Sequence, residues 1–557
     1  MAYDLVIRGV HVVDGTGQPG YPADVAVVGP RIAAIGTLSG PAREVIDGAG
    51  QTLLPGLIDP HSHADLIVPL PPSRQAELLR GKLSQGITTL LIGNCGLGCA
   101  PLGSARERSG RGDGESLLRS LHGWMTPERI DWPWRTTGEY LAHLEENGIV
   151  VNIGALVPHG PVRTAAMGLA QREPTGRELS AMRWLVEESL EAGALGLSSG
   201  LIYPPGLYSR PAELTALAKI VARKDGVYTS HIRGSSETLL RAVEELLAIG
   251  RTSGVRVHHS HNEAVGRDHW SKIERVLQLE EQAEAEGIRI SYDMFPYTAA
   301  ATTMMAIYPP WALEGGFPKL RERLLDPTVR LRMAREVEQF RPRWPPWGPR
   351  GWPHNLVRAT GWDAITIGSV TQAVHRQYVN RTLTELGRLT GKHPFDAISD
   401  LLVAEEGQVS MLLFEISGED AQPEYLRRLA THRLASFCTD AEEVGRGVPH
   451  PAAYGAFPRL LSKFVGPPPL LSFEEAVHRM TLRPARLFGL RDRGVIRPGA
   501  FADLVLCQPE ELRDRATWRS PRRTASGISL LLINGGVAWR GGKLEAVRGQ
   551  VIRRDRS

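Results

Sequence analysis

Residues 57–66 read LIDPHSHADL, and this stretch decides the expected fold because two histidines stand two residues apart at the end of an apolar run. Side chains at positions i and i+2 of a strand point to the same face of a sheet, so His61 and His63 can reach one ion. Neutral imidazole is the commonest metal ligand, but an isolated His-x-His pair is about as often an ordinary polar loop. A metal site is therefore indicated only if further ligands follow at later strand ends.

The chain is long enough for more than one domain. Its 557 residues, 42% of them hydrophobic, can bury a large core, and we expect a big catalytic domain with a smaller one attached. The 65 basic and 61 acidic side chains nearly balance, and no block of lysine and arginine is dense enough to follow a phosphate backbone. We therefore expect no nucleic-acid partner.

Cysteine usage and hydropathy indicate the compartment. Four cysteines are too few for a disulfide framework in a chain of this size and suit a reduced protein. The N-terminal MAYDLVIRGVHVVDG lacks the layout of a signal peptide, and no run approaches the roughly 18 apolar residues of a membrane span. We expect a cytoplasmic protein with no membrane partner, and the oligomeric state stays open.

Both ends of the chain carry short alternating runs broken by Gly, Pro and Asp, which are typical of small antiparallel strands. They occur in residues 3–55 and again near the C-terminus, in FADLVLC and SLLLINGGVAWRGGKLEAVRGQVIRR. We expect residues 1–56 and 496–557 to form one small discontinuous β-sandwich domain around a catalytic middle, residues 57–495.

The middle of the chain alternates strand-like and helical stretches, a pattern that predicts βα units and a parallel sheet. Eight such units predict an α/β fold, a (β/α)8 barrel whose chemistry lies at the C-terminal ends of the strands. The expected strands are residues 53–59, 88–93, 150–157, 194–199, 227–232, 255–261, 288–294 and 434–439.

Residues 302–360 interrupt this pattern. They contain few regular patterns and a Trp- and Pro-rich segment, RPRWPPWGPRGW, at 341–352. Because long irregular loops inside a domain are usually functional, we expect this insertion to be a lid or wall over the site.

The C-terminal ends of the expected strands carry a restricted set of polar residues. Imidazoles, a thiol and a carboxylate that converge on one barrel mouth suit zinc. Taken alone, His231 could be a buried structural histidine and Cys95 an inert core residue. His258 and His259 compete with His261 in the sixth expected strand; His259 shares its strand face and stays an alternative, and the position nearest the strand end is preferred. The set is His61, His63, Cys95, His231, His261 and Asp440.

The order of motifs His-x-His, GNCG, TSHIR, SHNE and TDAE, followed by HPAAYGAFPRLLSKF, resembles the amidohydrolase superfamily and, within it, the N-acyl-D-amino-acid deacylases, or D-aminoacylases. The likeness runs along nearly the whole chain and implies a distorted (β/α)8 barrel with a small β domain. It implies that Cys95, His231 and His261 hold one tight Zn2+ ion, and that His61 and His63 share Cys95 in a second, weaker site. It makes Asp440 the catalytic acid and base.

The chemistry that this resemblance implies is hydrolysis of a C–N amide bond. Zinc polarises a carbonyl and acidifies water, and Asp440 would move the proton from that water to the leaving nitrogen. Two further residues at strand ends, His159 and Tyr203, are expected to line the pocket, although a structural role suits either as well.

The residues that read the substrate depart from the deacylase pattern. That subgroup holds the α-carboxylate of its substrate with a lysine, a tyrosine, a serine and an arginine. The matching positions here are Glu263, Phe295, Ala301 and Ala452. A carboxylate left unpaired in a desolvated pocket costs several kcal/mol, roughly the price of an unmade charged hydrogen bond, so we expect a substrate without the usual free α-carboxylate. If a carboxylate is bound after all, Arg233 is the first residue to suspect.

These observations leave four hypotheses. The leading one is zinc-dependent hydrolysis of a linear N-acyl bond in a small acylated amine or amino-acid derivative. The alternatives are an N-acyl-D-amino-acid deacylase proper, a hydantoinase-like cyclic amidase, and a barrel scaffold without catalysis. The complete set of six metal and acid/base candidates argues against the scaffold.

Overall fold

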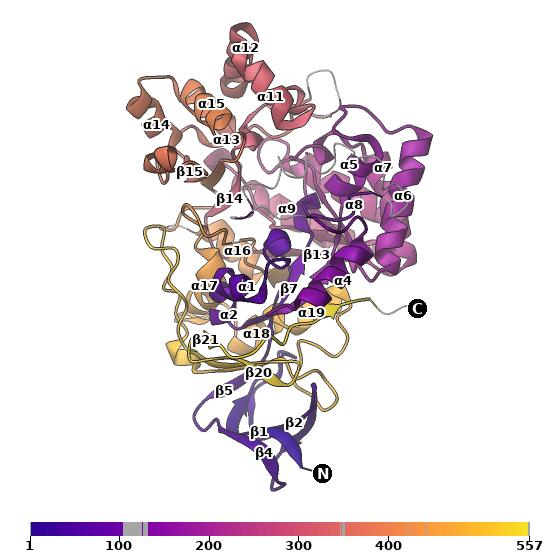
Figure 1. Ribbon diagram of the computed structural model, residues 1–557, viewed down its shortest axis with the longest axis vertical. Helices are drawn as coiled ribbons and strands as arrows, with labels where there is room; N and C mark the ends of the chain where they lie inside the picture. The colour runs from indigo at the N-terminus through magenta and orange to yellow at the C-terminus, as the bar shows by residue number, and fades with distance from the viewer. Residues whose placement is uncertain are drawn as a thin grey trace.

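The structure is a computed structural model that describes residues 2–103, 125, 128, 132–345, 347, 351–421, 423–441 and 443–554. The molecule is elongated, with a β-rich end that carries the N-terminus, a barrel in the middle and a helical unit at the far end (Figure 1). No helix in these ranges combines the length and the apolar character needed to cross a bilayer.

Strands from both ends of the chain form one nine-stranded sheet. The sheet branches at β1, whose first residues pair with β4 while His11 and Val12 pair with β5. The strands expected to form a sandwich are therefore hydrogen-bonded into a single branched sheet, in which the antiparallel pairing of β5 with β18 joins the N-terminal strands to the C-terminal ones. Its strands are β1 (Tyr3–Val12), β2 (Tyr21–Val28), β3 (Arg31–Gly36), β4 (Ala42–Asp47), β5 (Thr52–Pro55), β18 (Leu504–Cys507), β19 (Ile528–Ile533), β20 (Gly536–Arg540) and β21 (Lys543–Leu544).

The C-terminal end of the chain differs from the expectation that residues 496–557 belong wholly to this β-rich unit. The last strand, β22 (Val551–Ile552), pairs in parallel with β8 of the barrel. Backbone hydrogen bonds from Ile153 to Gln550 and from Arg554 to Gly193 continue this contact. The end of the chain thus adds an edge strand to the barrel sheet that contains β6, β7 and β8.

The barrel strands are parallel and follow one another in chain order, which confirms the expected (β/α)8 barrel. The third strand is broken at Leu156, so the hydrogen-bonded ladder is divided into two sheets. The strands are β6 (Leu57–Asp59), β7 (Ile87–Ile92), β8 (Asn152–Ala155) with β9 (Val157–Pro158), β10 (Gly196–Gly200), β11 (Val227–His231), β12 (Arg256–His259), β13 (Ile290–Met294) and β17 (Ala435–Phe437).

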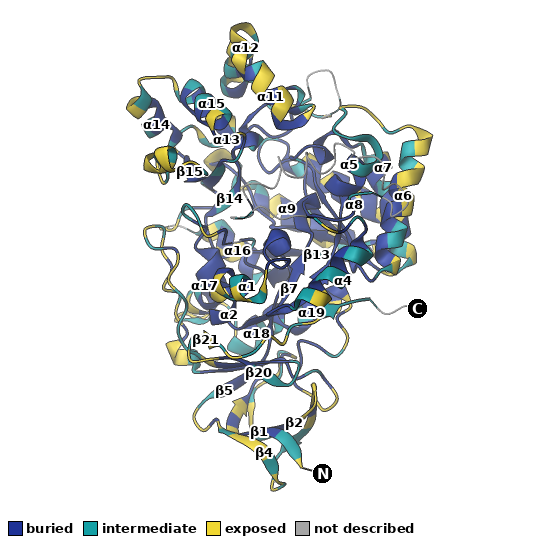
Figure 2. Ribbon diagram, viewed as in Figure 1, coloured by how far each residue is buried: buried dark blue, intermediate teal, exposed yellow. Residues whose placement is uncertain are grey.

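Amphipathic helices cover the barrel, with their buried faces inward and their outer faces exposed (Figure 2). Local signals set their ends: Thr175 and Glu178 form a capping box on α6, and Gly254 ends α8 in the left-handed conformation. The helices are α1 (Pro72–Leu78), α2 (Arg80–Ser84), α4 (Thr137–Asn147), α5 (His159–Met167), α6 (Gly176–Glu191), α7 (Pro211–Arg223), α8 (Leu239–Ser253), α9 (Lys272–Ala285), α16 (Glu424–Thr431), α17 (Ala452–Leu460), α18 (Phe473–Met480) and α19 (Leu482–Phe488).

The insertion after the seventh barrel strand is more regular than its sequence predicts. A three-stranded sheet and several helices surround a separate hydrophobic core, so the expectation of an irregular stretch over 302–360 is wrong. Trp352, in the Trp- and Pro-rich segment, is buried in that core and stacks on Phe340 at 5.7 Å between ring centroids. The elements are β14 (Ala299–Thr303), α10 (Pro310–Leu313), α11 (Gly316–Leu325), α12 (Pro327–Gln339), α13 (Leu356–Thr360), β15 (Ile365–Ser369), α14 (Leu383–Thr390), α15 (Pro394–Ala404) and β16 (Ser410–Phe414).

Candidate metal centre and catalytic pocket

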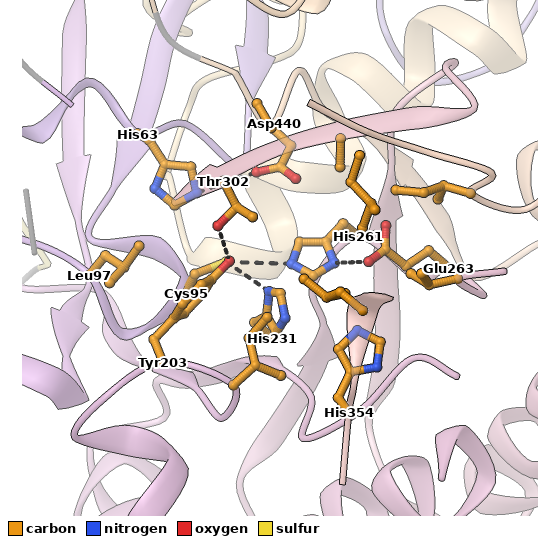
Figure 3. A pocket seen from close by; sticks show the side chains of 17 residues that line it. His63, Cys95, Leu97, Tyr203, His231, His261, Glu263, Thr302, His354 and Asp440 are labelled. Carbon is orange, nitrogen blue, oxygen red and sulfur yellow. Dashed lines mark hydrogen bonds and ion pairs between the residues drawn. The ribbon is translucent and has the colours of Figure 1, made fainter. Parts of the chain in front are cut away.

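The polar residues at the C-terminal strand ends converge at one end of the barrel (Figure 3). Cys95 lies at their centre, in a short turn directly after β7. Its Sγ is 3.2 Å from His61 Nε2, 3.5 Å from His261 Nε2 and 3.8 Å from His231 Nδ1. A buried thiol that touches three imidazoles is the arrangement expected of ligands around a metal ion.

Two groups of donors share the Cys95 thiol. His61, His63 and Cys95 form one group, and Cys95, His231 and His261 form the other. Within each group the ligand atoms lie within 4.8 Å of one another, and all the residues are buried. These are the two ligand sets that the motifs predicted, and they allow two ions to share one sulfur.

The backbone is strained where it presents these donors. Cys95, His261 and Asp440 adopt positive φ angles of 53°, 36° and 44°, each just past the end of a strand. A left-handed conformation is uncommon for residues other than glycine and persists where the surrounding structure requires it, often at functional sites. The same local geometry turns three different side chains into the mouth of the barrel.

The electrostatics of the centre favour bound positive charge. Burial would raise the pKa of the Cys95 thiol, but the neighbouring His61 and His261 hold it well below its usual value. Burial would lower the pKa of His63, but Asp440 and Cys95 raise it to about 10. Burial, with the charge of His261, lowers the pKa of His231 to about 4. Protons on the other histidines balance the buried anions, and a metal ion would displace them.

Asp440 faces two of these imidazoles. Its Oδ1 lies 3.2 Å from His61 Nε2 and 3.3 Å from His63 Nε2. Burial opposes ionisation, but His61 and His63 lower the pKa of the Asp440 carboxyl below its usual value. Its backbone N–H donates to the carbonyl of His61 at 3.0 Å, which ties the eighth strand end to the first. The carboxylate is therefore ionised and fixed beside the donor groups.

Asp293, at the end of β13, is a supporting residue that the sequence interpretation missed. Its Oδ2 lies 3.2 Å from His61 Nδ1 and 2.8 Å from His258 Nε2, and its Oδ1 accepts from the N–H of His261 at 2.6 Å. Partners of this kind orient metal-binding imidazoles. The rule that selected the other strand-end residues would also have selected Asp293.

The competing histidines of the sixth strand point away from the centre. His258 bonds to Asp293 and Ser291, and His259 Nδ1 lies 2.8 Å from Glu280. The preference for His261, the histidine nearest the strand end, therefore agrees with the geometry.

The donor set suits a zinc ion. Thiolate sulfur and imidazole nitrogen are the ligands of zinc in proteins, and a catalytic site needs an open position beside them. The pocket supplies that opening, and the Nδ1 atom of His63 is buried without a hydrogen-bond partner in the described structure. The residues present thus fit the metal that the motifs implied.

The pocket above the centre has two walls, one from barrel strand ends and one from the insertion. Tyr203 links them, since its hydroxyl bonds to Thr302 Oγ1 at 2.8 Å. The lining residues are His63, Cys95, Leu97, Ile202, Tyr203, His231, His261, Glu263, Val265, Ala300, Ala301, Thr302, His354, Leu356, Leu413, Ile416 and Asp440.

Three of the expected substrate residues line this pocket: Tyr203, Glu263 and Ala301. Phe295 and Ala452 do not. Both are buried, and the ring of Phe295 packs edge-on against His450 at 5.9 Å between ring centroids.

His159 and Arg233 do not take the pocket-lining positions expected of them. Buried carboxylates contact one ring nitrogen of His159 and the guanidinium group of Arg233. His159 Nε2 lies 2.8 Å from Glu213. Arg233 forms a bidentate pair with Glu245 at 2.9 Å and donates to two backbone carbonyls. Neither lines the catalytic pocket, although Arg233 lines a neighbouring cavity that shares Ile202 and His354 with it, where its guanidinium is already paired with Glu245.

His354 is a pocket residue that no sequence signal identified, because it belongs to the insertion. Its Nδ1 bonds to Ser236 Oγ at 2.9 Å. Burial and the nearby His231 lower the pKa of His354 to about 3, so the ring is neutral. It offers the pocket a neutral polar group.

A parallel eight-stranded barrel with sulfur, nitrogen and carboxylate groups at the C-terminal strand ends defines a metal-dependent hydrolase. The chain belongs to the amidohydrolase family, whose model matches residues 44–538. It is therefore an enzyme that hydrolyses C–N bonds, and the resemblance found in the motifs is confirmed.

Curated relatives and solved structures agree with this assignment. The chain is 32% identical to an N-acyl-D-glutamate deacylase of Alcaligenes xylosoxydans xylosoxydans, over 100% of this chain and 97% of the relative. A crystal structure of N-acyl-D-glutamate deacylase from Bordetella bronchiseptica, complexed with zinc and a phosphonate inhibitor, matches with a TM-score of 0.79, 30% identity and full coverage of both chains. A D-hydantoinase from Thermus sp. covers 99% of both chains at a TM-score of 0.54 and 15% identity, which is a likeness of fold alone.

Proposed function

We propose that this protein is a zinc-dependent hydrolase of linear N-acyl bonds whose substrate carries no free α-carboxylate in the pocket. The claim that the substrate lacks this carboxylate rests on one observation. Among the described residues that line the pocket there is no lysine or arginine, whereas there are two carboxyl groups, Glu263 and Asp440. The sequence and structural similarity to N-acyl-D-amino-acid deacylases supports hydrolysis of a linear N-acyl bond.

Asp440 is the residue proposed to move protons. A zinc ion in this centre would supply Lewis-acid chemistry, which polarises carbonyl groups and acidifies water. The ionised Asp440 carboxylate, held by His61 and His63, can accept a proton from an attacking water at its Oδ atoms. The same carboxyl can then donate that proton to the leaving nitrogen, which must be protonated to depart as an amine.

Glu263 is the residue proposed to exclude a carboxylate. It is buried, lies 3.7 Å from His261 Nδ1 through Oε1, and leaves Oε2 without a partner in the described structure. In either protonation state it offers no positive charge to an anion. The free oxygen can instead accept a hydrogen bond from an amide or an amine of the substrate.

The apolar part of the substrate has a separate place. A neighbouring cavity shares Leu97, Ile202 and Tyr203 with the catalytic pocket and is almost wholly apolar. Met305, Ala306 and Leu313 close it from the insertion. An apolar acyl group or side chain would lose water contact there, a gain of roughly 25 cal/mol for each Å² buried.

The second candidate is an N-acyl-D-amino-acid deacylase proper, which the names of the similar proteins favour. It requires a cation for the carboxylate, and the described pocket lining lacks one. The cyclic amidase has only the shared fold in its support, since the hydantoinase structure is 15% identical.

The test is a comparison of kcat/KM for one N-acyl amino acid and its amide. We expect the wild-type enzyme to prefer the amide by about 100-fold or more, because several kcal/mol separate a paired from an unpaired buried charge and each 1.4 kcal/mol is tenfold. Glu263→Lys should shift the preference toward the free acid. Glu263→Gln, which keeps the size but removes the charge, is the matched control and should lie between the two.

A wild-type enzyme that prefers the free acid would overturn the proposed substrate class while leaving amide hydrolysis intact. Absence of hydrolysis for every linear amide, with zinc bound, would overturn the reaction itself.

A further inference from the structure

A second cavity lies at the opposite end of the barrel, next to the β-rich unit. It has a volume of about 860 Å³, within the range of small-molecule sites. Arg256, at its wall, begins β12, whereas His261 lies beyond the end of that strand. Five residues at about 3.3 Å each separate the two, so the cavity is roughly 16 Å from the metal centre.

The lining of this cavity is dominated by positive charge. Nine of its residues are arginine or lysine and two are aspartate, whereas the whole chain carries a net charge of only +4. The excess is therefore a local feature and not a general basicity of the protein. The charged lining residues are Arg31, Arg223, Lys224, Arg256, Arg486, Arg491, Arg493, Arg553, Arg554, Asp225 and Asp492.

The two aspartates do not neutralise this charge. Arg256 and Arg289 both pair with Asp225, at 3.2 Å and 3.0 Å. Arg554 lies close enough to the same carboxylate to lower its pKa as well. Asp492 is likewise shared, between Arg31 and Arg497.

Several of the other cations pair with carboxylates outside the cavity. Arg553 pairs with Glu145 at 2.9 Å and Lys224 with Glu191 at 3.5 Å, and Arg493 pairs with the buried Asp503. These contacts hold the side chains in place. Within the cavity, arginine side chains therefore outnumber the two carboxylates, Asp225 and Asp492.

Two guanidinium groups are available to a ligand. Within the described ranges, neither Arg486 nor Arg554 forms a side-chain hydrogen bond or ion pair. Burial lowers the pKa of Arg554; the nearby Asp225 opposes this shift and the charge of Arg256 adds to it. The cavity lining has two rings: Phe488 is buried, and Phe501 is in contact with Arg31 and Arg493, which lie 4.3 Å and 3.9 Å from its centroid.

We propose that this cavity binds a small oligophosphate, either inorganic or as the phosphate chain of a nucleoside triphosphate. Guanidinium groups bind phosphate oxygens in a two-pronged geometry, and several of them converge here from separate parts of the chain. A multivalent anion would cross-link β3, the end of α7, the loop after α19 and the C-terminal strand. Because Phe488 is buried and Phe501 is already in contact with two arginines, the phosphates rather than a stacked base would be recognised.

The experiment measures binding of tripolyphosphate and of ATP to the zinc-loaded full-length enzyme by calorimetry, at low and at physiological ionic strength. The test variant is Arg486→Glu with Arg554→Glu. The control, Arg177→Glu with Arg183→Glu, makes the same change of charge on the exposed face of α6. Adenosine, which lacks phosphate, is the ligand control.

We expect saturable binding of tripolyphosphate that weakens at least about tenfold in the test variant and is unchanged in the control, since each charged hydrogen bond contributes roughly 1.5–3 kcal/mol. Binding should raise the thermal midpoint of the wild type and of the control. Hydrolytic kcat/KM should be unchanged in both variants, which shows that they fold. ATP and tripolyphosphate of equal affinity would identify the phosphate chain as the ligand, whereas tighter ATP would add the nucleoside.

Two results would overturn the proposal. One is the absence of saturable tripolyphosphate binding to the wild-type enzyme. The other is an equal loss of affinity in both charge variants, because that would show attraction to net charge and not to a site.

Discussion

The two walls of the catalytic pocket differ in origin and in character. The strand-end wall carries His63, Cys95, His231, His261 and Asp440, and it is polar and charged. The wall from the insertion is mostly apolar, with Thr302 and His354 as its polar groups among Ala300, Ala301, Leu356, Leu413 and Ile416. The difference shows that the groups proposed for catalysis, and Glu263, which is proposed to exclude a carboxylate, come from the barrel, whereas the insertion adds mainly apolar surface.

Asp440→Asn should have the largest effect on the strand-end wall. The amide can neither accept nor return the proton, so kcat should fall by about 10² to 10⁴ while the bound zinc is retained. The measurement is steady-state kinetics together with metal analysis. Glu263→Gln, a neighbouring change of the same kind, should keep turnover on an amide substrate. An Asn variant with a tenth of wild-type turnover would assign the base to another residue.

Cys95→Ala tests whether the same wall holds the metal. Wild-type protein should carry between one and two zinc ions, and the variant should lose the tightly held one because no neighbour supplies a thiolate. Metal content after dialysis measures this. Cys507→Ala removes an equally buried thiol on β18 and should leave the metal content unchanged. Full zinc occupancy without Cys95 would place the ligand elsewhere.

Trp352→Ala tests whether the insertion acts as a separate wall. Loss of this buried ring should destabilise the insertion by about 3–5 kcal/mol. Substrate affinity should weaken, whereas zinc content should not change. Trp184→Ala, at a ring that is 49% exposed on α6, is the control and should leave stability nearly unchanged. Loss of zinc in the Trp352 variant would show that the two walls are not independent.

Tyr203→Phe makes the smallest expected change, at the contact between the walls. It removes the hydrogen bond to Thr302, a net contribution of about 0.5–1.5 kcal/mol. We expect up to about a tenfold rise in KM with little change in kcat. In a double-mutant cycle, Thr302→Val should add almost nothing to Tyr203→Phe. Fully additive effects would mean that the two hydroxyls act on the substrate separately.

The strand-end wall could be predicted because its information is local. Each of its candidate metal ligands lies at or just after the end of a short apolar run, so the barrel topology brings His61, Cys95 and His261 together once eight parallel strands are recognised. Asp293 could have been found in the same way. The insertion wall could not be predicted, since its sequence has no strong period and its core forms only when distant segments pack together.

The substrate residues show the limit of transferring motifs one position at a time. Arg233 stands two residues after His231, a candidate metal ligand, and was the first cation to suspect, yet Glu245 on α8 pairs with it. Phe295 and Ala452 were expected at carboxylate-binding positions from the motifs, but they are buried and do not line the pocket. Which side chains reach a cavity depends on how the walls pack, and a motif does not contain that information.

The sequence by itself determined the family, the parallel barrel and the donors at its mouth, because hydrophobic periodicity and strand-end residues are properties of short segments. Tertiary structure alone decided which cations are free and which are already paired. Arg256, Arg486 and Arg554 are far apart in the chain and ordinary in their local sequence, but they meet at one cavity because β22 returns to the barrel and α19 ends beside β12. Charge acts through space, so its balance at a site appears only when the chain has folded.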